Sequence, residues 1–248
     1  MIQGAIVVTG TSRGIGTEIA IELARRGFKV GCVSRGGGLP PSDKPPSAEI
    51  LERLLPVTAD VTDEAALRDC IAKINEWGGG IGGLVNNAGI HRDVRASKLI
   101  TADFEEVMRV NTTSTFTACR EVYPYLSKNK SGLIINMGSF FEKIGVKGYA
   151  AYCASKAAVG ALTRVLAAEW GRDNISVLNI APGYIETDMN RDYLNAGESG
   201  ENVRSRTPVR RPGSVSEIAR LIAALYVEDI VFLTEETIYV DGGRGISL

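Results

Sequence analysis

A tyrosine and a lysine stand four residues apart in a segment that is predicted to be helical. Residues 150–170 are mostly small or straight-chain and include Tyr152 and Lys156, and side chains four apart share one helical face. A fixed positive charge favours the phenolate, so Lys156 is expected to lower the pKa of Tyr152 toward neutrality. Such a phenol suits general acid catalysis at a carbonyl oxygen. By itself the pair is a weak signal, because many helices carry this spacing only as a surface pair.

The start of the chain predicts a site for a nucleotide phosphate. Residues 5–9 form an apolar, β-branched run, and a helical pattern extends from the glycine-rich turn at residues 10–16 as far as Gly27. Glycines let backbone N–H groups approach a phosphate at a helix N-terminus. The spacing Gly-x-x-x-Gly-x-Gly differs from the common dinucleotide fingerprint, so a helix start that merely needs glycine is the alternative.

The end of the second predicted strand, residues 28–34, indicates which nucleotide is bound. A carboxylate there would accept hydrogen bonds from the ribose of NAD, whereas a basic side chain would pair with the extra phosphate of NADP. The chain has Ser34 and Arg35 at this point and Arg13 in the glycine turn, which favours NADP(H) as the cofactor. The alternative is that Arg35 is only a solvated charge at the end of the strand. Residues 36–46 are rich in glycine and proline and exclude a regular helix. They form either a loop over the adenosine end or a tolerated insertion.

Polar residues follow the third and fourth predicted strands. Residues 54–59 precede Asp60, which could bond an adenine amino group or help to cap the next helix, and Thr62 is expected to be that helix's cap. The fourth strand leads into residues 86–89, Asn-Asn-Ala-Gly, a pattern suited to a loop beside a flat ligand. Both segments are expected at the edge of a sheet where ligands bind.

Two further side chains are predicted to approach the Tyr152 helix. Residues 101–126 are predicted to be one long helix, in which Asn111 is unfavourable and is a candidate for holding a water or bending the helix. A surface position is the alternative for Asn111. Residues 133–137 form the fifth strand, and Ser139 follows thirteen residues before Tyr152. The end of this strand brings the Ser139 hydroxyl within plausible reach of the pair.

The C-terminal third completes the alternation of strands and helices. Residues 175–180 are the sixth strand, and residues 190–208 are polar with little periodicity, which suits a substrate lid or an ordinary surface loop. Ser214 and Glu217 have capping-box spacing, and residues 238–240 form a last strand. Continuous alternation without a linker predicts an α/β, doubly wound parallel sheet of the Rossmann type with helices on both faces. Residues 1–248 are expected to form one domain.

Composition excludes several classes of partner. The chain has 44% hydrophobic and 23% charged residues and a formal net charge of −1, which gives no electrostatic reason to expect nucleic acid or a membrane surface. Four scattered cysteines and one histidine favour free thiols in a reducing compartment over disulfides or a metal site. No apolar run approaches the roughly 18 residues of a membrane span. A cytoplasmic protein is expected.

Taken in order, the motifs resemble the short-chain dehydrogenase/reductase family over nearly the whole chain. They are Thr9-Gly10-x-x-x-Gly14-Ile15-Gly16, Asp60, Asn86-Asn87-Ala88-Gly89, Asn111, Ser139, Tyr152-x-x-x-Lys156, Pro182-Gly183 and Asp241-Gly242-Gly243. The resemblance implies that Ser139 orients the substrate carbonyl and that Tyr152 donates or takes the proton. It also implies that Lys156 lowers the pKa of Tyr152 and that Asn111 anchors a water of a proton relay. It implies a nicotinamide cofactor held by Gly10, Ser12, Arg13, Gly14, Ile15, Gly16, Ser34, Arg35, Asp60, Val61, Asn87, Ala88, Gly89, Tyr152, Lys156, Pro182, Gly183, Ile185 and Thr187.

Within the family, two substrate classes compete. Residues 87–93 and 182–189 resemble 3-oxoacyl-[acyl-carrier-protein] reductases, whereas residues 168–170 and 180–184 also resemble sugar-acid reductases such as gluconate 5-dehydrogenase. Small ketones are a further alternative. The family departures are residues 36–46, in place of the start of a helix, and Glu235-Glu236 before the last strand.

The remaining expectations concern substrate and partners. His91 and Tyr184 are substrate candidates beside Ser139, although a structural role in its loop is favoured for His91. Lys128, Lys130 and Arg172 are a candidate patch for an acidic acyl-carrier protein, with solvated helix-end charges as the alternative. The family resemblance implies a homotetramer. A cofactor-sensing or scaffolding protein without turnover is the alternative of another class, which the presence of all four catalytic residues disfavours.

Overall fold

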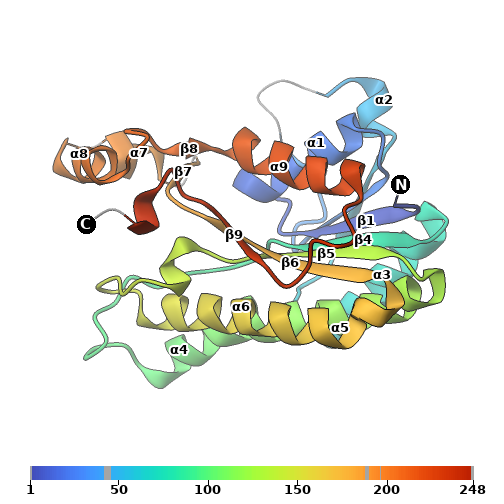
Figure 1. Cartoon of the computed structure of the whole chain (residues 1–248), viewed down its shortest axis with the longest axis horizontal. Helices are drawn as coiled ribbons and strands as arrows, with labels where there is room; N and C mark the ends of the chain where they lie inside the picture. The colour runs from blue at the N-terminus through green and yellow to red at the C-terminus, as the bar shows by residue number, and fades with distance from the viewer. Residues whose placement is uncertain (1, 42–45, 188–189, 196, 247–248) are drawn as a thin grey trace.

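A seven-stranded parallel sheet forms the centre of the molecule, as the computed structural model describes it for residues 2–41, 46–187, 190–195 and 197–246 (Figure 1). The strand order is β3-β2-β1-β4-β5-β6-β9, and every neighbouring pair is parallel. The strands are β1 (Ala5–Thr9), β2 (Val30–Ser34), β3 (Leu54–Thr58), β4 (Ile81–Asn86), β5 (Gly132–Met137), β6 (Ile175–Pro182) and β9 (Thr237–Val240). The predicted doubly wound fold is therefore confirmed.

Helices cover both faces of this sheet (Figure 1). The helices α1 (Gly14–Arg25) and α9 (Val215–Glu228) pack on one face, where their apolar side chains join one buried cluster with β1, β2 and β5. The helices α3 (Glu64–Gly78), α5 (Ser114–Asn129) and α6 (Ala150–Trp170) build a second cluster on the other face. Strands β1 and β4 are neighbours although β2 and β3 lie between them in sequence, so the strand order reverses here. Ligands bind beyond the carboxyl ends of the strands at such a point.

One glycine of β4 is required by the packing of α9. The ring of Tyr226 is fully buried, and its hydroxyl donates to the carbonyl oxygens of Leu84 at 3.1 Å and Leu133 at 2.9 Å. A Cβ atom on Gly83 would lie 2.4 Å from the Tyr226 ring, which real contacts do not allow. The glycine therefore lets α9 dock directly on β4 and β5.

The predicted long helix at residues 101–126 is interrupted. It consists of α4 (Thr101–Met108), a π-helical turn at Arg109–Thr113 and α5, which ends at Asn129. The hydroxyls of Ser114 and Thr115 bond back to the carbonyl oxygens of Val110, at 2.6 Å, and Asn111, at 2.8 Å. Such bonds compete with the helical backbone ladder, and π-turns are frequent at functional sites.

Capping contacts test the predicted N-termini of α3 and α9. The cap of α3 is Asp63, whose carboxylate accepts from the Ala66 N–H at 3.1 Å, so the predicted cap Thr62 is wrong. Thr62 instead donates to Asp60, which is the stronger acceptor nearby. The predicted capping box of α9 is confirmed between Ser214 and Glu217.

The segments predicted to be irregular differ from each other. Residues 36–41 contain no helix, and the short helix α2 (Ala48–Leu51) begins only after the proline-rich stretch; residues 42–45 lie outside the described part. Residues 190–208 instead contain two helices, α7 (Arg191–Asn195) and α8 (Gly197–Arg206). A two-stranded sheet of β7 (Ile185–Glu186) and β8 (Gly213–Ser214) joins this helical pair to the central sheet.

Candidate active site

Helix α6 presents Tyr152 and Lys156 toward the carboxyl end of β5. The ammonium Nζ of Lys156 donates to the Met137 carbonyl oxygen at 2.6 Å and lies 5.6 Å from the centroid of the Tyr152 ring. Lys156 is buried with 5% of its surface exposed, whereas Tyr152 keeps part of its surface accessible. The two side chains therefore share one face of the helix, as predicted, but the ammonium is anchored to β5.

Ser139 meets Tyr152 at the end of β5. Its hydroxyl oxygen accepts from the Phe141 N–H at 3.2 Å, at the start of a 3₁₀ turn formed by Phe140–Glu142, and the hydroxyl is close enough to Tyr152 to act on the pKa of that phenol. Ser139 is buried at 7% exposure. Two hydroxyl groups thus converge where a single carbonyl oxygen could accept from both.

Burial controls the protonation of the pair. It raises the pKa of Tyr152 to about 12, and the hydrogen bond with Ser139 only partly opposes this. Burial also lowers the pKa of Lys156 to about 8, against the opposing negative charge of Glu142. The predicted lowering of the Tyr152 pKa by Lys156 is therefore wrong for this structure, because desolvation outweighs an ammonium that is turned toward Met137. At neutral pH the phenol is protonated and Lys156 is largely charged.

Asn111 ties the loop after β4 to α6. Its side chain accepts from the Ile90 N–H at 2.8 Å, and its amide donates to the Ile90 carbonyl oxygen at 2.9 Å and to the Ser155 hydroxyl at 3.0 Å. The side chain is buried at 1% exposure. The surface alternative for Asn111 is therefore wrong. A π-helical turn lies at this residue, and the predicted hold on a relay water stays a prediction.

A cluster of aromatic rings surrounds Tyr152. The ring of Phe141 lies 5.9 Å and that of His91 6.2 Å from the Tyr152 ring, centroid to centroid. The imidazole of His91 also stacks on Tyr149 at 5.8 Å. Tyr184, from the segment after β6, contacts Phe141 at 6.2 Å. The structure therefore brings together the substrate candidates Ser139, His91 and Tyr184, and their apolar neighbours favour an apolar substrate.

Sequence reasoning missed two of these rings, Phe141 and Tyr149. Phe141 follows Ser139 by two residues, and Tyr149 precedes Tyr152 by three. Residues three apart share a helical face, so Tyr149 could have been assigned to the site from spacing alone. The position of Phe141 depends on the 3₁₀ turn after Ser139, for which the sequence has no clear signal.

The glycine turn fits the pyrophosphate of a dinucleotide. The backbone of Gly10 has φ +73° and that of Gly14 φ +61°, and a Cβ atom on Gly16 would lie 2.3 Å from both Asn87 Nδ2 and the Gly10 carbonyl oxygen. The cap residue of α1, Arg13, makes no side-chain capping bond. The first N–H groups of α1 are therefore left to a ligand, as a phosphate site requires. Ser12 and Ile15 belong to the same turn.

Asn87 holds the loop after β4 against this turn. Its amide donates to the carbonyl oxygens of Thr9 at 3.0 Å and Gly10 at 3.1 Å, while the N–H groups of Asn87 and Ala88 donate to the Thr9 hydroxyl. On the far side of the loop, a Cβ atom on Gly89 would lie 3.7 Å from Lys156 Nζ. One short loop therefore connects the glycine turn with the catalytic candidates.

The charged groups at the ends of β2 and β3 lie on the surface. The guanidinium groups of Arg13 and Arg35 are exposed and make no hydrogen bond or ion pair within the described ranges, and Ser34 Oγ accepts from Gly37 N–H at 3.1 Å. Hydrogen bonds from Thr62 and the charge of Arg35 lower the pKa of Asp60. Val61 follows Asp60 at this edge. Asp60 therefore lies within the electrostatic influence of Arg35, and the guanidinium groups of Arg35 and Arg13 have no partner in the described ranges that would compete with a phosphate.

The segment after β6 approaches the glycine turn from the other side. A Cβ atom on Gly14 would lie 3.5 Å from the Thr187 methyl group, and one on Gly183 would lie 2.6 Å from the Asp241 Cα atom. Pro182 ends β6, and the side chain of Ile185 is buried. Of the predicted cofactor residues Pro182, Gly183, Ile185 and Thr187, it is Thr187 that lies beside the glycine turn, at Gly14. Residues 188–189 lie outside the described ranges.

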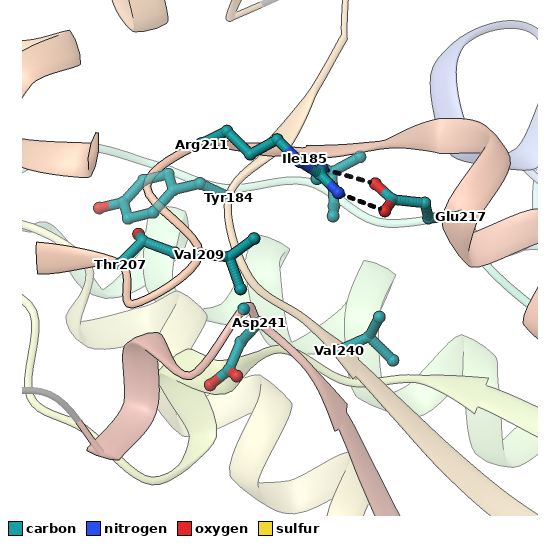
Figure 2. A pocket seen from close by; sticks show the side chains of 10 residues that line it. Tyr184, Ile185, Thr207, Val209, Arg211, Glu217, Val240 and Asp241 are labelled. Atoms are coloured by element: carbon teal, nitrogen blue, oxygen red, sulfur yellow. Dashed lines mark hydrogen bonds and ion pairs between the residues drawn. The ribbon is translucent and has the colours of Figure 1, made fainter. Parts of the chain in front are cut away.

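Behind Tyr184 this segment lines a small pocket of about 210 Å³. Figure 2 shows the guanidinium of Arg211 bonded to the carboxylate of Glu217 at one side of it, through contacts of 2.9 and 2.7 Å. Ser139, Tyr152 and Lys156 are not among its lining residues, so it is separate from the catalytic candidates. Its wall includes Tyr184, Ile185, Thr207, Val209, Arg211, Glu217, Val240 and Asp241.

The candidate patch for an acidic carrier lies at the opposite edge of the sheet from the catalytic candidates. Lys130 precedes β5 and forms an ion pair with Asp173, whereas Ser139 follows β5. Arg172 lies in the turn before β6, at the same edge as Lys128 and Lys130. This patch is separated from the catalytic candidates by the length of the strands, so it does not border the site.

Metal-ligating side chains do not cluster in the described part of the chain. The described residues contain no group of three or more histidine, cysteine, aspartate or glutamate side chains placed to share a metal ion. All four cysteines are free thiols, and burial raises the pKa of Cys32 and Cys119 to about 12 and that of Cys70 to about 11. Within the same ranges, no helix has the length and apolar character to span a membrane.

Comparison with known proteins gives matches over nearly the full chain. A family model described as enoyl-(acyl carrier protein) reductase matches residues 10–244. The chain is 33% identical over 245 residues to the 3-oxoacyl-[acyl-carrier-protein] reductase MabA of Mycobacterium tuberculosis, with 99% of this chain and 94% of the relative covered. It is 36% identical over 241 residues to a glucose 1-dehydrogenase of Gluconobacter oxydans, with 96% and 90% covered.

A solved structure agrees with this assignment of the fold. The putative gluconate dehydrogenase of Agrobacterium tumefaciens superimposes with a TM-score of 0.87 at 31% sequence identity, covering 100% of this chain and 98% of the other. The relatives therefore include proteins named for 3-oxoacyl thioesters and proteins named for sugars or sugar acids.

Proposed function

The chain belongs to the short-chain dehydrogenase/reductase family, and we propose that it reduces a 3-oxoacyl thioester with NADPH. As a member of this family it is an oxidoreductase that acts on CH–OH and C=O groups, and the family binds a nicotinamide cofactor. The observation that carries the proposal is that Tyr152 lies beside buried Lys156 and near Ser139, within a cluster of aromatic rings. This arrangement suits protonation of a carbonyl oxygen in an apolar cleft.

Proton transfer is the work of the chain's own side chains. The Ser139 hydroxyl donates a hydrogen bond to the carbonyl oxygen and fixes its position, and the Tyr152 phenol donates the proton that turns this oxygen into a hydroxyl. The Lys156 ammonium stabilises the phenolate that Tyr152 becomes. Asn111 holds Ile90 and Ser155 in place and thereby positions α6 against the loop after β4. When bound, the nicotinamide supplies the hydride that the carbonyl carbon accepts.

NADP(H) is favoured by the two exposed arginines. Arg13 and Arg35 flank the end of β2, and the acidic side chain that would select NAD by bonding its ribose is not at this position, which holds Ser34. The glycine turn, with its uncapped α1 N-terminus, would hold the pyrophosphate. Residues 87–89 and 182–187 would border the rest of the cofactor, and Asp60 and Val61 its adenine.

The choice of substrate depends on the walls around Tyr152. Phe141, Tyr149 and Tyr184 offer apolar ring surface to an acyl chain, which favours a 3-oxoacyl thioester. A sugar acid is the second candidate, because glucose and gluconate dehydrogenases are among the relatives. A sugar acid would need polar partners for several hydroxyl groups, and His91 and the tyrosine hydroxyls are the polar groups of this cluster.

Three further proposals concern the setting of the enzyme. We propose a homotetramer, as the family resemblance implies, and an acyl-carrier protein as the partner that presents the substrate. Because the patch around Lys130 lies at the opposite edge of the sheet, the carrier would dock at the carboxyl edge instead. A cytoplasmic location stays a prediction from composition.

A panel of substrates tests the proposal. We expect purified protein to consume NADPH with 3-oxoacyl thioesters at a higher kcat/KM than with keto-sugar acids or small ketones. A preference for sugar acids would replace the first candidate with the second. NADPH binding without turnover of any member of the panel would contradict both and favour a cofactor-sensing protein.

A further inference from the structure

Glu142 lies over the face of α6 that carries Tyr152 and Lys156. Gly160 stands one helical turn beyond Lys156, and a Cβ atom on Gly160 would lie 3.5 Å from Glu142 Oε1. A Cβ atom on Gly138 would lie 2.8 Å from Glu142 Oε2, and Lys156 Nζ is bonded to Met137, the residue before Gly138. Two glycines thus make room for a carboxylate next to the buried lysine.

Two side chains donate hydrogen bonds to the carboxylate of Glu142. Asn179 donates through Nδ2 to Glu142 Oε2, and Tyr239 donates through its hydroxyl to Oε1, both at 2.9 Å. An ionised carboxylate accepts at both oxygens, whereas a protonated one must donate its own proton. Burial raises the pKa of Tyr239 to about 12, so its phenol remains a donor at neutral pH.

The side-chain amide of Asn179 is oriented toward Glu142 at the expense of its own oxygen. The side chain is fully buried, and its Oδ1 has no hydrogen-bond partner among the described residues. Its Nδ2 donates to Glu142 and to the Thr237 hydroxyl, at 2.9 and 3.1 Å. A buried acceptor without a partner destabilises the folded state. The amide is therefore held with its donors toward Glu142 in spite of that cost.

Few charged groups lie around this pair of side chains. Lys156 faces Tyr152 on its own helix and the negative charge of Glu142. Around Glu142, the ammonium of Lys143 lies 3.5 Å from the Tyr239 ring centroid, and the carboxylates of Glu236 and Asp241 act on Tyr239 from beyond it. Glu142 is thus the carboxylate that opposes the effect of burial on Lys156.

We propose that Glu142 is a positioning residue for proton transfer, whose carboxylate keeps the buried Lys156 ammonium charged so that it can stabilise the Tyr152 phenolate. This inference rests on the proposed function for the role of Lys156. Glu142 itself touches neither of the two reacting hydroxyls; it acts through the lysine.

The variant Glu142→Gln tests this through the pH profile of carbonyl reduction. Reduction needs Tyr152 protonated and Lys156 charged, and Lys156 has the lower pKa of the two. The alkaline limb of kcat/KM therefore reports Lys156. We expect E142Q to move this limb to lower pH by about one unit. A loss of activity at every pH with the limb unmoved would mean that Glu142 is merely structural, and would overturn the proposal.

Two further variants separate charge from packing. Tyr239→Phe removes one hydrogen bond to Glu142 but keeps the carboxylate, so its limb should stay close to that of the parent. Glu142→Asp keeps the charge, so its alkaline limb should lie closer to that of the parent protein than to that of E142Q. If E142Q does not fold, a parent-like limb in Glu142→Asp with a displaced limb in Tyr239→Phe would overturn the proposal, because the hydrogen bond and not the charge would then matter.

A titration of Lys156 in the absence of substrate tests the role of Glu142 independently of the proposed reductase function. The ammonium signal of Lys156 can be followed by NMR in lysine-labelled protein and assigned with Lys156→Arg. A lower titration midpoint in E142Q supports the coupling, and an unchanged midpoint overturns it, whether or not a substrate is reduced. Absence of turnover by the parent protein would instead contradict the proposed function.

Discussion

At the scale of single residues, burial matters more than the spacing of Tyr152 and Lys156. The spacing predicts a shared helical face, and the structure confirms it. The ammonium, however, is bonded to the Met137 carbonyl oxygen, and burial raises the pKa of Tyr152 to about 12. Tyr152 is thus held as a proton donor, which is the state that reduction requires.

The first prediction concerns the phenol itself. Tyr152→Phe keeps the ring in its aromatic cluster but removes the proton donor, so kcat for carbonyl reduction should fall about a hundred- to ten-thousand-fold. NADPH binding, measured by fluorescence titration, should weaken far less than kcat falls. Tyr149→Phe removes a hydroxyl from a neighbouring ring and should cause a clearly smaller loss of kcat. Equal losses in the two variants would remove Tyr152 from its proposed role.

The second prediction concerns the end of β2. Arg35→Ala should weaken NADPH binding by about tenfold or more, the value of one charge-assisted hydrogen bond, and should leave NADH binding nearly unchanged. Calorimetric titration with both nucleotides measures the ratio. Arg220→Ala, on the exposed side of α9, is the control and should keep the preference. Equal affinity of the parent protein for NADPH and NADH would refute the argument from Arg13 and Arg35.

At the scale of elements, the end of α9 near the pocket gives a prediction about stability. Hydrogen bonds from Arg211 and from the Ser214 backbone lower the pKa of Glu217 to about 2. A carboxylate with a depressed pKa stabilises the folded state above its unfolded pKa, and this contribution is lost as the pH falls toward the folded value. The stabilisation should therefore be complete at pH 6–7 and should decline below about pH 5.

Urea unfolding at several pH values measures this effect. The difference in free energy of unfolding between the parent protein and Glu217→Gln should be largest near neutral pH and should shrink as the pH falls. Glu228→Gln, at the other end of α9, is the matched control for the loss of one carboxylate from this helix. A difference that stays constant down to the lowest pH at which the protein folds would contradict the role of the Arg211–Glu217 pair.

Elements could be predicted where a local pattern decides them. The strands appear in the predicted order because each is a short apolar run, and the capping box of α9 depends on two residues of fixed spacing. The π-turn at Arg109–Thr113 was not predicted, since it depends on Asn111 bonding Ile90, twenty-one positions earlier in the chain. The helices α7 and α8 were missed because their sequences have little apolar periodicity.

At the scale of the molecule, the sheet explains why the site residues meet. Residues distant in sequence, such as Gly16, Asn87 and Tyr152, each follow or flank a strand at its carboxyl end, and the strand order reverses between β1 and β4. The sequence predicts this edge. It does not predict that Phe141, Tyr149 and His91 enclose the phenol, because these contacts depend on how loops fold over α6.

Hydride transfer to a carbonyl carbon is the central claim, and isotope transfer measures it most directly. The protein would be incubated with NADPH carrying deuterium in place of both hydrogens at nicotinamide C4, together with a 3-oxoacyl thioester. We predict that mass spectrometry of the product finds one deuterium on the carbon that bears the new hydroxyl group, and that Tyr152→Phe forms far less of this product. Bound NADPH with no deuterated alcohol from this substrate, from a keto-sugar acid or from a small ketone would contradict the account.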